Sequence, residues 1–232
     1  AGDVLGGNMR LAAYPPGKGD ITNMIRSYIH RCQKDGVKIV MNCEVTPELI
    51  KEEKPDSVII ATGSKTLILP IEGIDNPAII HGSDLLDGKR PAGKKVLVVG
   101  GGMVGCETAA FLGEQEHDVT VIEFRDTVGA DVIHEHRVYL MKDFEDYGIK
   151  EITGAKVCKF YEDGVEYETA DGVRHETRGY DSVILSMGFR NYNPLEEKIK
   201  DLVPETHVIG DAIRARRALD ATKEAYEVAS RL

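Results

Sequence analysis

Short apolar runs along this chain alternate with segments whose apolar residues recur at the spacing of an amphipathic helix. The apolar runs predict strands at residues 37–41, 57–61, 96–99, 119–123, 180–186 and 206–209. The helical spacing predicts helices at residues 21–35, 46–53, 107–115, 132–147 and 216–232. Because strands that alternate with helices favour a parallel sheet, the pattern predicts the α/β fold class.

A different pattern covers residues 149–174, where the run is rich in strand-forming residues and is broken by two turns. The turns are Glu162-Asp163-Gly164 and Ala170-Asp171-Gly172, and Asp-Gly between alternating residues is a strong hairpin signal. This part predicts an antiparallel β-meander beside the parallel sheet. Residues 1–19 and 70–93 are rich in glycine and proline and predict a loop and a linker.

The strand at residues 96–99 runs into the most informative motif of the chain, Gly100-x-Gly102-x-x-Gly105, which a helix follows. Gly100 permits the tight turn, Gly102 lets the backbone approach a pyrophosphate, and Gly105 lets the helix pack close to the strand. The helix N-terminus offers unpaired N–H groups and a partial positive charge. An ordinary turn also contains glycine, but the flanking elements agree on a dinucleotide-binding loop.

An acidic residue, Glu123, ends the strand that follows this helix. A carboxylate there accepts hydrogen bonds from the adenosine ribose of a dinucleotide. It favours NAD over NADP, because a carboxylate repels the 2′-phosphate of NADP. Arg125 keeps NADP open, since an arginine at this place can pair with a phosphate.

The net charge of −10 argues against binding to nucleic acid or to an anionic membrane, since both need clustered positive charge. No run approaches the roughly 18 apolar residues of a membrane-spanning helix, and no secretory signal pattern opens the sequence. The expected location is therefore the cytoplasm.

The cysteines and histidines do not form a recognisable metal or redox motif. The four cysteines are dispersed without a Cys-x-x-Cys pair, which indicates buried reduced thiols rather than a redox dithiol or an iron–sulfur cluster. His134 and His136 would lie on different faces of a helix, and the other histidines are isolated. We expect no metal site, and no nucleophile context of the Ser/His/Asp or Cys/His kind stands out.

Two further strand ends carry small residues, Ala61-Thr62-Gly63 and Gly210-Asp211. Ligands of open α/β sheets bind at the carboxyl ends of strands. Each segment alone reads equally well as a plain turn. Together, on either side of a dinucleotide motif, they support each other as parts of a second nucleotide site.

The ordered motifs Leu-Gly-Gly, strand-Ala-Thr-Gly-Ser, strand-Gly-Gly-Gly-Met-Val-Gly-Cys-Glu, strand-Met-Gly and Val-Ile-Gly-Asp-Ala resemble the flavoproteins with two dinucleotide-binding domains. The segments Leu-Gly-Gly-Asn-Met-Arg-Leu-Ala-Ala and Pro-Pro-Gly-Lys resemble the C-terminal part of the family that includes 2,4-dienoyl-CoA reductase, 2-enoate reductase and trimethylamine dehydrogenase. In that family an N-terminal barrel carries FMN, an iron–sulfur cluster and the substrate site, and the C-terminal part binds FAD and a nicotinamide nucleotide.

The resemblance implies two sets of binding residues. On the FAD side, Gly6 and Gly7 approach the pyrophosphate or ribityl chain, Val45 touches adenine, Thr62 and Gly63 lie near the phosphates, and Gly210 and Asp211 hold the ribityl and phosphate region. On the nicotinamide side, the pyrophosphate is cradled by Gly100, Gly102, Met103, Val104 and Gly105, while Glu123 takes the ribose and Gly188 closes over the cofactor. Glu107 matches a glutamate close to the nicotinamide, and a solvated helix glutamate is the equal alternative.

The first fingerprint of such a protein, which cradles the FAD pyrophosphate, would precede Leu5, and only four residues do. The expected organisation is a truncated FAD-binding α/β domain (1–66 and 191–232) with an inserted Rossmann-like NAD(P)-binding domain (67–190). The predicted function is part of an NADH-dependent flavin oxidoreductase, with no catalytic residue of its own, that takes hydride from NADH onto FAD for a barrel domain outside this chain. The fragment alone is not expected to be fully active. The alternatives are a redox-silent module that binds ADP or another nucleotide, as in trimethylamine dehydrogenase, and a non-catalytic fragment that assembles with a partner polypeptide.

Overall fold

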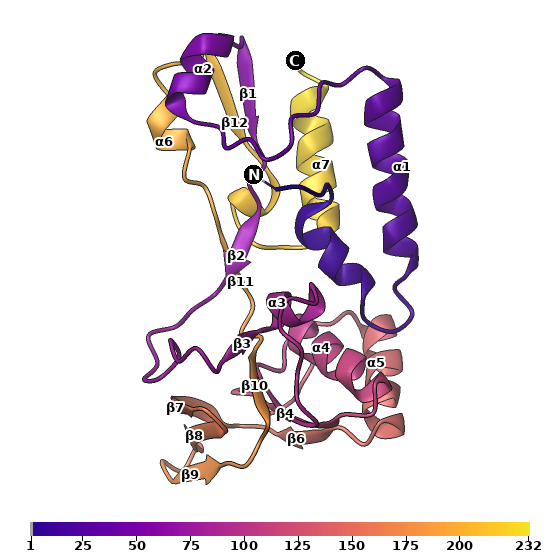
Figure 1. The fold of residues 1–232 in the computed structure, drawn as a ribbon, viewed down its shortest axis with the longest axis vertical. Coiled ribbons are helices and arrows are strands. Elements are labelled where there is room, and N and C mark those ends of the chain that lie inside the picture. Colours follow the sequence, from indigo (N-terminus) through magenta and orange to yellow (C-terminus); the bar gives the residue numbers. More distant parts are fainter. Residues whose placement is uncertain (1) are drawn as a thin grey trace. The chain divides into compact units, whose positions relative to one another are not determined.

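A computed structural model describes residues 2–232 and divides them into two compact units. The first unit comprises residues 2–10, Ile21–Lys65 and Phe189–Leu232, and the second comprises Leu11–Asp20 and Thr66–Gly188. The chain therefore enters the second unit twice, once with the short segment Leu11–Asp20 and once with most of its middle part (Figure 1).

The second unit is built on a five-stranded parallel sheet in the order β3-β10-β4-β5-β6. Its strands are β3 (Ile80–His81), β4 (Lys95–Val99), β5 (Asp118–Ile122), β6 (Lys150–Ile152) and β10 (Ser182–Leu185). The helices are α3 (Gly82–Leu86), α4 (Met103–Glu114) and α5 (His134–Asp146). β10 follows the meander in the sequence but lies between β3 and β4 in the sheet.

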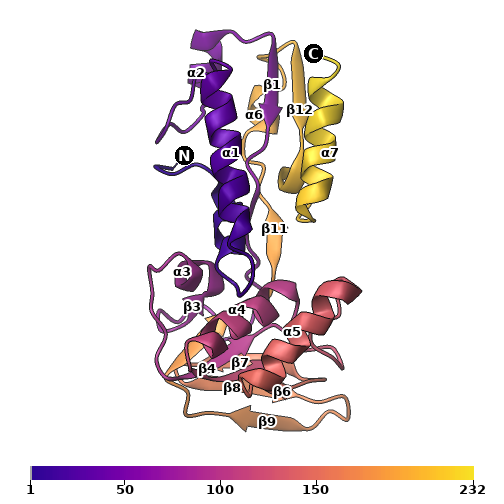
Figure 2. The same cartoon turned by 90° about the vertical axis from the view of Figure 1, so that its right-hand side faces the viewer.

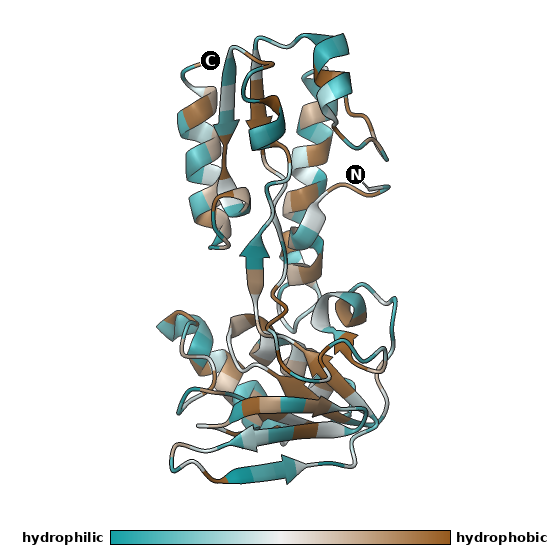
Figure 3. Cartoon of the chain, turned by 90° about the vertical axis from the view of Figure 1, so that its left-hand side faces the viewer, coloured by the Kyte–Doolittle hydropathy of each residue, from teal (hydrophilic) through white to brown (hydrophobic). Residues whose placement is uncertain are grey.

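Alternating side chains of the central strands pack on different partners. Val96, Val98 and Val121 belong to one apolar cluster with residues of α4 and α5. Leu97 and Val99 belong to another, with residues of the antiparallel sheet β7-β8-β9. Its strands are β7 (Lys156–Tyr161), β8 (Gly164–Glu168) and β9 (Arg174–Thr177). The parallel sheet is therefore the middle layer of this unit, and its buried central strands are among the brown, hydrophobic segments of Figure 3.

The first unit contains a two-stranded parallel pair, β1 (Ser57–Ile60) and β12 (Glu205–Val208), which run side by side in Figure 2. Ile50, Ile60 and Ile199 form the centre of its small core. Its helices are η1 (Gly7–Ala13), whose last residues belong to the second unit, α1 (Asp20–Lys34), α2 (Pro47–Glu53), α6 (Glu196–Ile199), η2 (Gly210–Ala212) and α7 (Ala218–Ala229). A short pair, β2 (Ser64–Thr66) with β11 (Phe189–Asn191), lies where the chain changes unit.

The predicted α/β class is confirmed, with both the parallel sheet and the antiparallel meander. The turn after β7 includes Asp163, and the turn before β9 includes Asp171 and Gly172, as the Asp-Gly signals predicted. Helix α2 begins after Thr46, whose hydroxyl accepts the Leu49 N–H at 3.3 Å, and Pro47 fills its first position.

Four details of the sequence prediction are wrong. Residues 37–41 form no strand, because no strand in residues 2–232 lies beside them to share backbone hydrogen bonds. The linker at 70–93 contains β3 and α3, and the loop at 1–19 contains η1. These elements are too short to leave a periodic pattern. Helix α4 begins at Met103 instead of Glu107, since tertiary packing overrides the low helix propensity of Gly105.

Candidate dinucleotide-binding site

The glycine loop between β4 and α4 is shaped by close backbone contacts. Gly100 has a φ of +107°, and a Cβ atom on it would lie 2.5 Å from the carbonyl oxygen of Ser186 in the chain that leaves β10. A Cβ atom on Gly105 would lie 1.8 Å from the carbonyl oxygen of Gly100. Both positions therefore require glycine for packing, before any ligand is considered.

Two carboxylates accept N–H groups of this loop. Glu123 Oε2 accepts the Gly101 N–H at 2.6 Å, and Asp131 Oδ1 accepts the Met103 N–H at 2.9 Å. Met103 is the first residue of α4, so its N–H is one of the amides that a helix leaves without an intrahelical partner. Met103, which was predicted to face a pyrophosphate, and its neighbour in the loop, Gly101, thus already donate to anionic groups of the protein itself.

Glu123 follows β5 directly and is held firmly by its backbone. Its N–H donates to the Ile152 carbonyl at 2.8 Å, and its carbonyl accepts the Ala155 N–H at 2.9 Å. The second carboxylate oxygen, Oε1, accepts the Arg125 N–H at 2.9 Å. The Glu123 carboxylate therefore lies beside the glycine loop, where the ribose acceptor was predicted. Its contact with ribose stays a prediction.

Replacing Glu123 by alanine removes both the acceptor for Gly101 and the predicted ribose acceptor. We expect NADH to bind at least about tenfold more weakly, which corresponds to about 1.4 kcal/mol. The preference for NADH over NADPH should shrink at the same time, because the charge that repels a 2′-phosphate is gone. Calorimetric titration with both nucleotides measures this. The exposed neighbour Asp126, replaced by alanine, is the control, and equal losses in the two variants would contradict the role of Glu123.

Glu107 points into a charged contact rather than into solvent. It is 6% exposed, and its Oε1 pairs with Nζ of Lys18, which lies in the segment Leu11–Asp20. Nε2 of His136 on α5 lies 3.9 Å from the same oxygen. This rejects the solvated alternative for Glu107. Lys18 belongs to the Pro-Pro-Gly-Lys segment, which supported the family resemblance. No local pattern connects that segment with Glu107, which lies 89 positions further along the chain.

Gly188 lies just after β10, with a φ of +98° and its carbonyl accepting the Leu67 N–H at 2.9 Å. Nothing lies within 4 Å of a Cβ atom built on it, so its predicted approach to a cofactor rests on conformation and open space. Nearby on the same chain, Ser186 Oγ is buried without a hydrogen-bond partner among the described residues.

The residues predicted for FAD meet in the first unit around the ends of β1 and β12. Asp211 accepts from the Ser64 hydroxyl at 3.0 Å and from the Arg216 N–H at 3.0 Å. Asn8 Nδ2 donates to the Ser64 carbonyl at 3.1 Å, which brings the Gly6-Gly7 segment to the same place. Thr62 donates to the Tyr192 carbonyl at 2.5 Å.

The remaining residues of this group differ in their surroundings. Gly210 donates its N–H to Glu224 Oε2 on α7 at 2.7 Å. Cβ atoms on Gly7 and Gly63 would meet nothing within 4 Å, whereas one on Gly6 would lie 2.9 Å from Arg10 Cγ. Val45, in the loop before α2, is 45% exposed. Whether any of them touches FAD stays a prediction.

Cys106, on α4 beside the glycine loop, is the one buried cysteine of the four, so the predicted burial is wrong for exposed Cys32 and for the partly exposed Cys43 and Cys158. Burial raises the pKa of its thiol to about 12. Since the thiolate is the nucleophile, we expect Cys106 to resist iodoacetamide in the folded protein at about pH 8, while exposed Cys32 is alkylated. Peptide mass mapping before and after denaturation measures this. Alkylation of both at equal rates without denaturant would contradict it.

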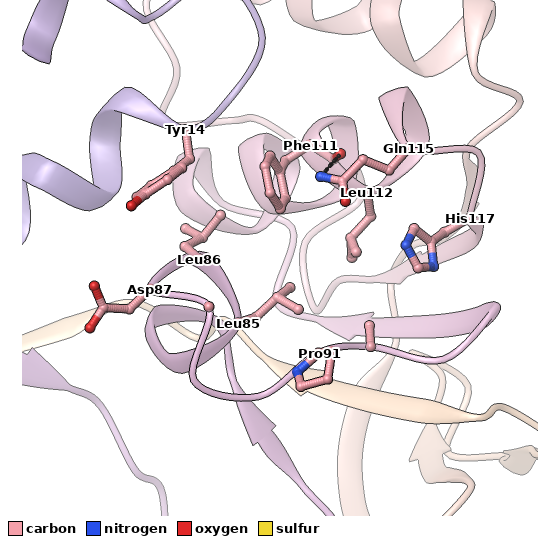
Figure 4. Close-up of a pocket in the computed structure, with 11 residues that line it drawn as sticks. Tyr14, Leu85, Leu86, Asp87, Pro91, Phe111, Leu112, Gln115 and His117 are labelled. Carbon is pink, nitrogen blue, oxygen red and sulfur yellow. Dashed lines mark hydrogen bonds between the residues drawn. The ribbon is translucent and has the colours of Figure 1, made fainter.

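A cavity of about 350 Å³ lies elsewhere in the second unit, against α3 and α4 (Figure 4). Leu85, Leu86, Phe111 and Leu112 supply apolar wall, and the Tyr14 ring meets Phe111 edge-on at 6.3 Å between centroids. No predicted site residue lines it.

Within the described residues, no group of His, Cys, Asp and Glu side chains could hold a metal ion. Among the same residues, no helix is both long and apolar enough to cross a bilayer.

A parallel sheet with a strand–glycine loop–helix unit and an acidic residue after the next strand defines a Rossmann-type nucleotide-binding protein. The model of the family described as pyridine nucleotide-disulphide oxidoreductase matches residues 18–207. The chain belongs to this family.

Comparison with individual proteins places the chain more narrowly within this family. The chain is 30% identical to a cinnamate reductase of Clostridium sporogenes over 98% of its length and 34% of the relative's. It is 32% identical to an NADH oxidase of Thermoanaerobacter brockii, over 97% of its length and 35% of the relative's. The structure of a 2-naphthoyl-CoA reductase in complex with 2-naphthoyl-CoA matches all of the chain and 35% of that protein, with 31% identity and a TM-score of 0.93.

These relatives confirm the predicted resemblance to the FAD- and NAD-binding part of the enoate reductase and trimethylamine dehydrogenase family. They support a general redox role and the binding of FAD and a nicotinamide nucleotide. The chain spans about a third of the length of the relatives it matches.

Proposed function

We propose that this chain is the electron-input part of a flavin oxidoreductase, in which NADH binds at the glycine loop of the second unit and FAD binds in the first. Residues 67–190 form the nicotinamide-nucleotide domain, and residues 1–66 and 191–232 form part of the FAD domain. With both nucleotides bound, FAD would accept a hydride from NADH, and the electrons would continue to an FMN and iron–sulfur barrel outside this chain.

The observation that carries the proposal is the glycine loop between β4 and α4. Two of its N–H groups already donate to carboxylates, Gly101 to Glu123 and Met103 to Asp131. Such donors at a helix N-terminus bind phosphate groups well. Glu123 stands beside the loop where a ribose hydroxyl would need an acceptor, which supports NADH over NADPH.

The turn around Asp211 supports FAD binding in the first unit. Ser64 and the Arg216 N–H hold its carboxylate before any ligand arrives, so little ordering is needed on binding. The open space beside Gly7 and Gly63 gives a phosphate or ribityl chain a close approach to the backbone. The residues present therefore fit a flavin nucleotide.

The residues of this chain bind and orient, while the cofactors supply the hydride chemistry when bound. Lys18 neutralises Glu107 and holds it in place within the second unit. His136 adds a third polar group at the same oxygen. No proton transfer is assigned to them, because hydride transfer between two bound cofactors needs orientation rather than a general base.

Anaerobic addition of NADH to the FAD-loaded chain tests the proposal. Loss of the oxidised flavin absorbance supports it, and NADPH should act more slowly. If the flavin stays oxidised although NADH binds, the hydride-transfer proposal is wrong. If the chain retains no FAD and binds ADP as tightly as NADH, a redox-silent nucleotide module replaces it.

A further inference from the structure

The contact between Asp131 and the first amide of α4 has a consequence for nucleotide affinity. The Met103 N–H donates to Asp131 Oδ1 at 2.9 Å, and Asp131 lies 28 positions further along the chain than Met103. A Cβ atom on the neighbouring Gly102 would lie 3.3 Å from Asp131 Oδ2. The carboxylate thus covers the helix terminus where the proposed function places a pyrophosphate.

Asp131 is held there by the loop that carries it. The Gly129 N–H donates to the Gly101 carbonyl at 2.7 Å, which ties this loop to the glycine loop. Val128 is fully buried and Val132 is 8% exposed, so both sides of the segment are anchored in the core. The contact is therefore built into the fold and is not a chance meeting of surface side chains.

Asp131 itself is exposed to solvent. Its carboxylate can rotate into water without the large desolvation change that a buried charge would undergo. A phosphate and a carboxylate cannot both accept the same N–H, and two anions in contact repel each other. Nucleotide binding must then release the Asp131 carboxylate from Met103.

We propose that Asp131 is an internal anion that competes with the dinucleotide phosphates for the N-terminus of α4 and so lowers the affinity for NADH. The inference rests on the proposed function, because it needs NADH at this loop. Asp131 stabilises the nucleotide-free protein by interacting with the helix dipole. Removing its charge should therefore change stability and affinity in opposite directions.

Asp131→Asn is the decisive variant, because it keeps the shape and removes the charge. We expect NADH to bind about fivefold to tenfold more tightly. A charge at a helix terminus changes a binding constant by a factor of up to about five when it is exposed, and by more than about ten when it is partly buried. The melting temperature without nucleotide should fall by a few degrees. Affinity for adenosine, which has no phosphate, should not change. Glu135→Gln, an exposed acid on α5, is the matched charge control and should leave the NADH affinity unchanged.

A role in capping alone would lower the melting temperature and leave the NADH affinity unchanged or weaker, which would overturn the inference while the proposed function stands. If neither the wild type nor Asp131→Asn binds NADH, the proposed function fails and this inference with it. A measurement on the wild type avoids any folding defect of the variant. The carboxyl ¹³C resonance of Asp131 should move toward that of a solvated carboxylate when NADH is added, and no movement at saturation contradicts the competition.

Discussion

Gly100→Ala is expected to destabilise the protein by about 3 kcal/mol and to abolish measurable NADH binding. The positive φ of Gly100 costs about 1–2 kcal/mol for a residue with a Cβ atom. The new atom would also lie 2.5 Å from the backbone oxygen of Ser186, which cannot swing away as a flexible side chain can. Overpacking of this kind adds about 1–3 kcal/mol.

Thermal unfolding measures the first effect, with an expected fall in melting temperature of about 6–12 °C for a chain of this size. Gly172→Ala separates the two causes, because Gly172 also has a positive φ but nothing lies within 4 Å of its Cβ position. Equal losses in the two variants would show that backbone conformation alone decides, and the close contact with Ser186 would then contribute nothing.

Lys18→Met is expected to cost about 2 kcal/mol, because it leaves the Glu107 carboxylate nearly buried without its cation. This cost is smaller than the usual cost of breaking a fully buried ion pair, since the Lys18 side chain is 22% exposed and water can reach part of the site. The double variant Lys18→Met with Glu107→Gln should recover about half of the loss, because the uncompensated charge is then gone.

Lys142→Met is the matched control. Its ammonium pairs with Asp146 on the surface of α5, where the side chains are 66% and 50% exposed. Surface pairs of this kind contribute little to stability, because water and salt screen the two charges. Urea unfolding of the four proteins gives the comparison. A loss at Lys18 no larger than that at Lys142, or a double variant worse than the single one, would contradict a coupled buried pair.

Local features of the sequence predicted the framework of the second unit well. The run at residues 96–99, the glycines after it and the Asp-Gly turns all act within a few residues, and β4, the glycine loop and the meander follow them. The strand predicted at 37–41 failed for the opposite reason. A strand exists only where another strand accepts its hydrogen bonds, and a local pattern carries no information on that partner.

The contacts that complete the candidate site join residues far apart in sequence. Lys18 and Glu107 are separated by 89 positions, and Asp131 and Met103 by 28. Spacing predicted that Glu123 lies near the loop, and the family resemblance implied that Glu107 lies near the nicotinamide. Neither predicted that Lys18 pairs with Glu107 or that Asp131 covers the helix terminus. Which of the predicted residues touch a cofactor stays a prediction in both units.

The central claim, that NADH binds at the glycine loop through the N-terminus of α4, is tested most directly by amide NMR of the chain during an NADH titration. The account predicts that the amide resonances of Gly101, Gly102, Met103, Val104 and Gly105 shift together with that of Glu123, with one dissociation constant. Saturating shifts elsewhere, with these amides unmoved, would contradict it.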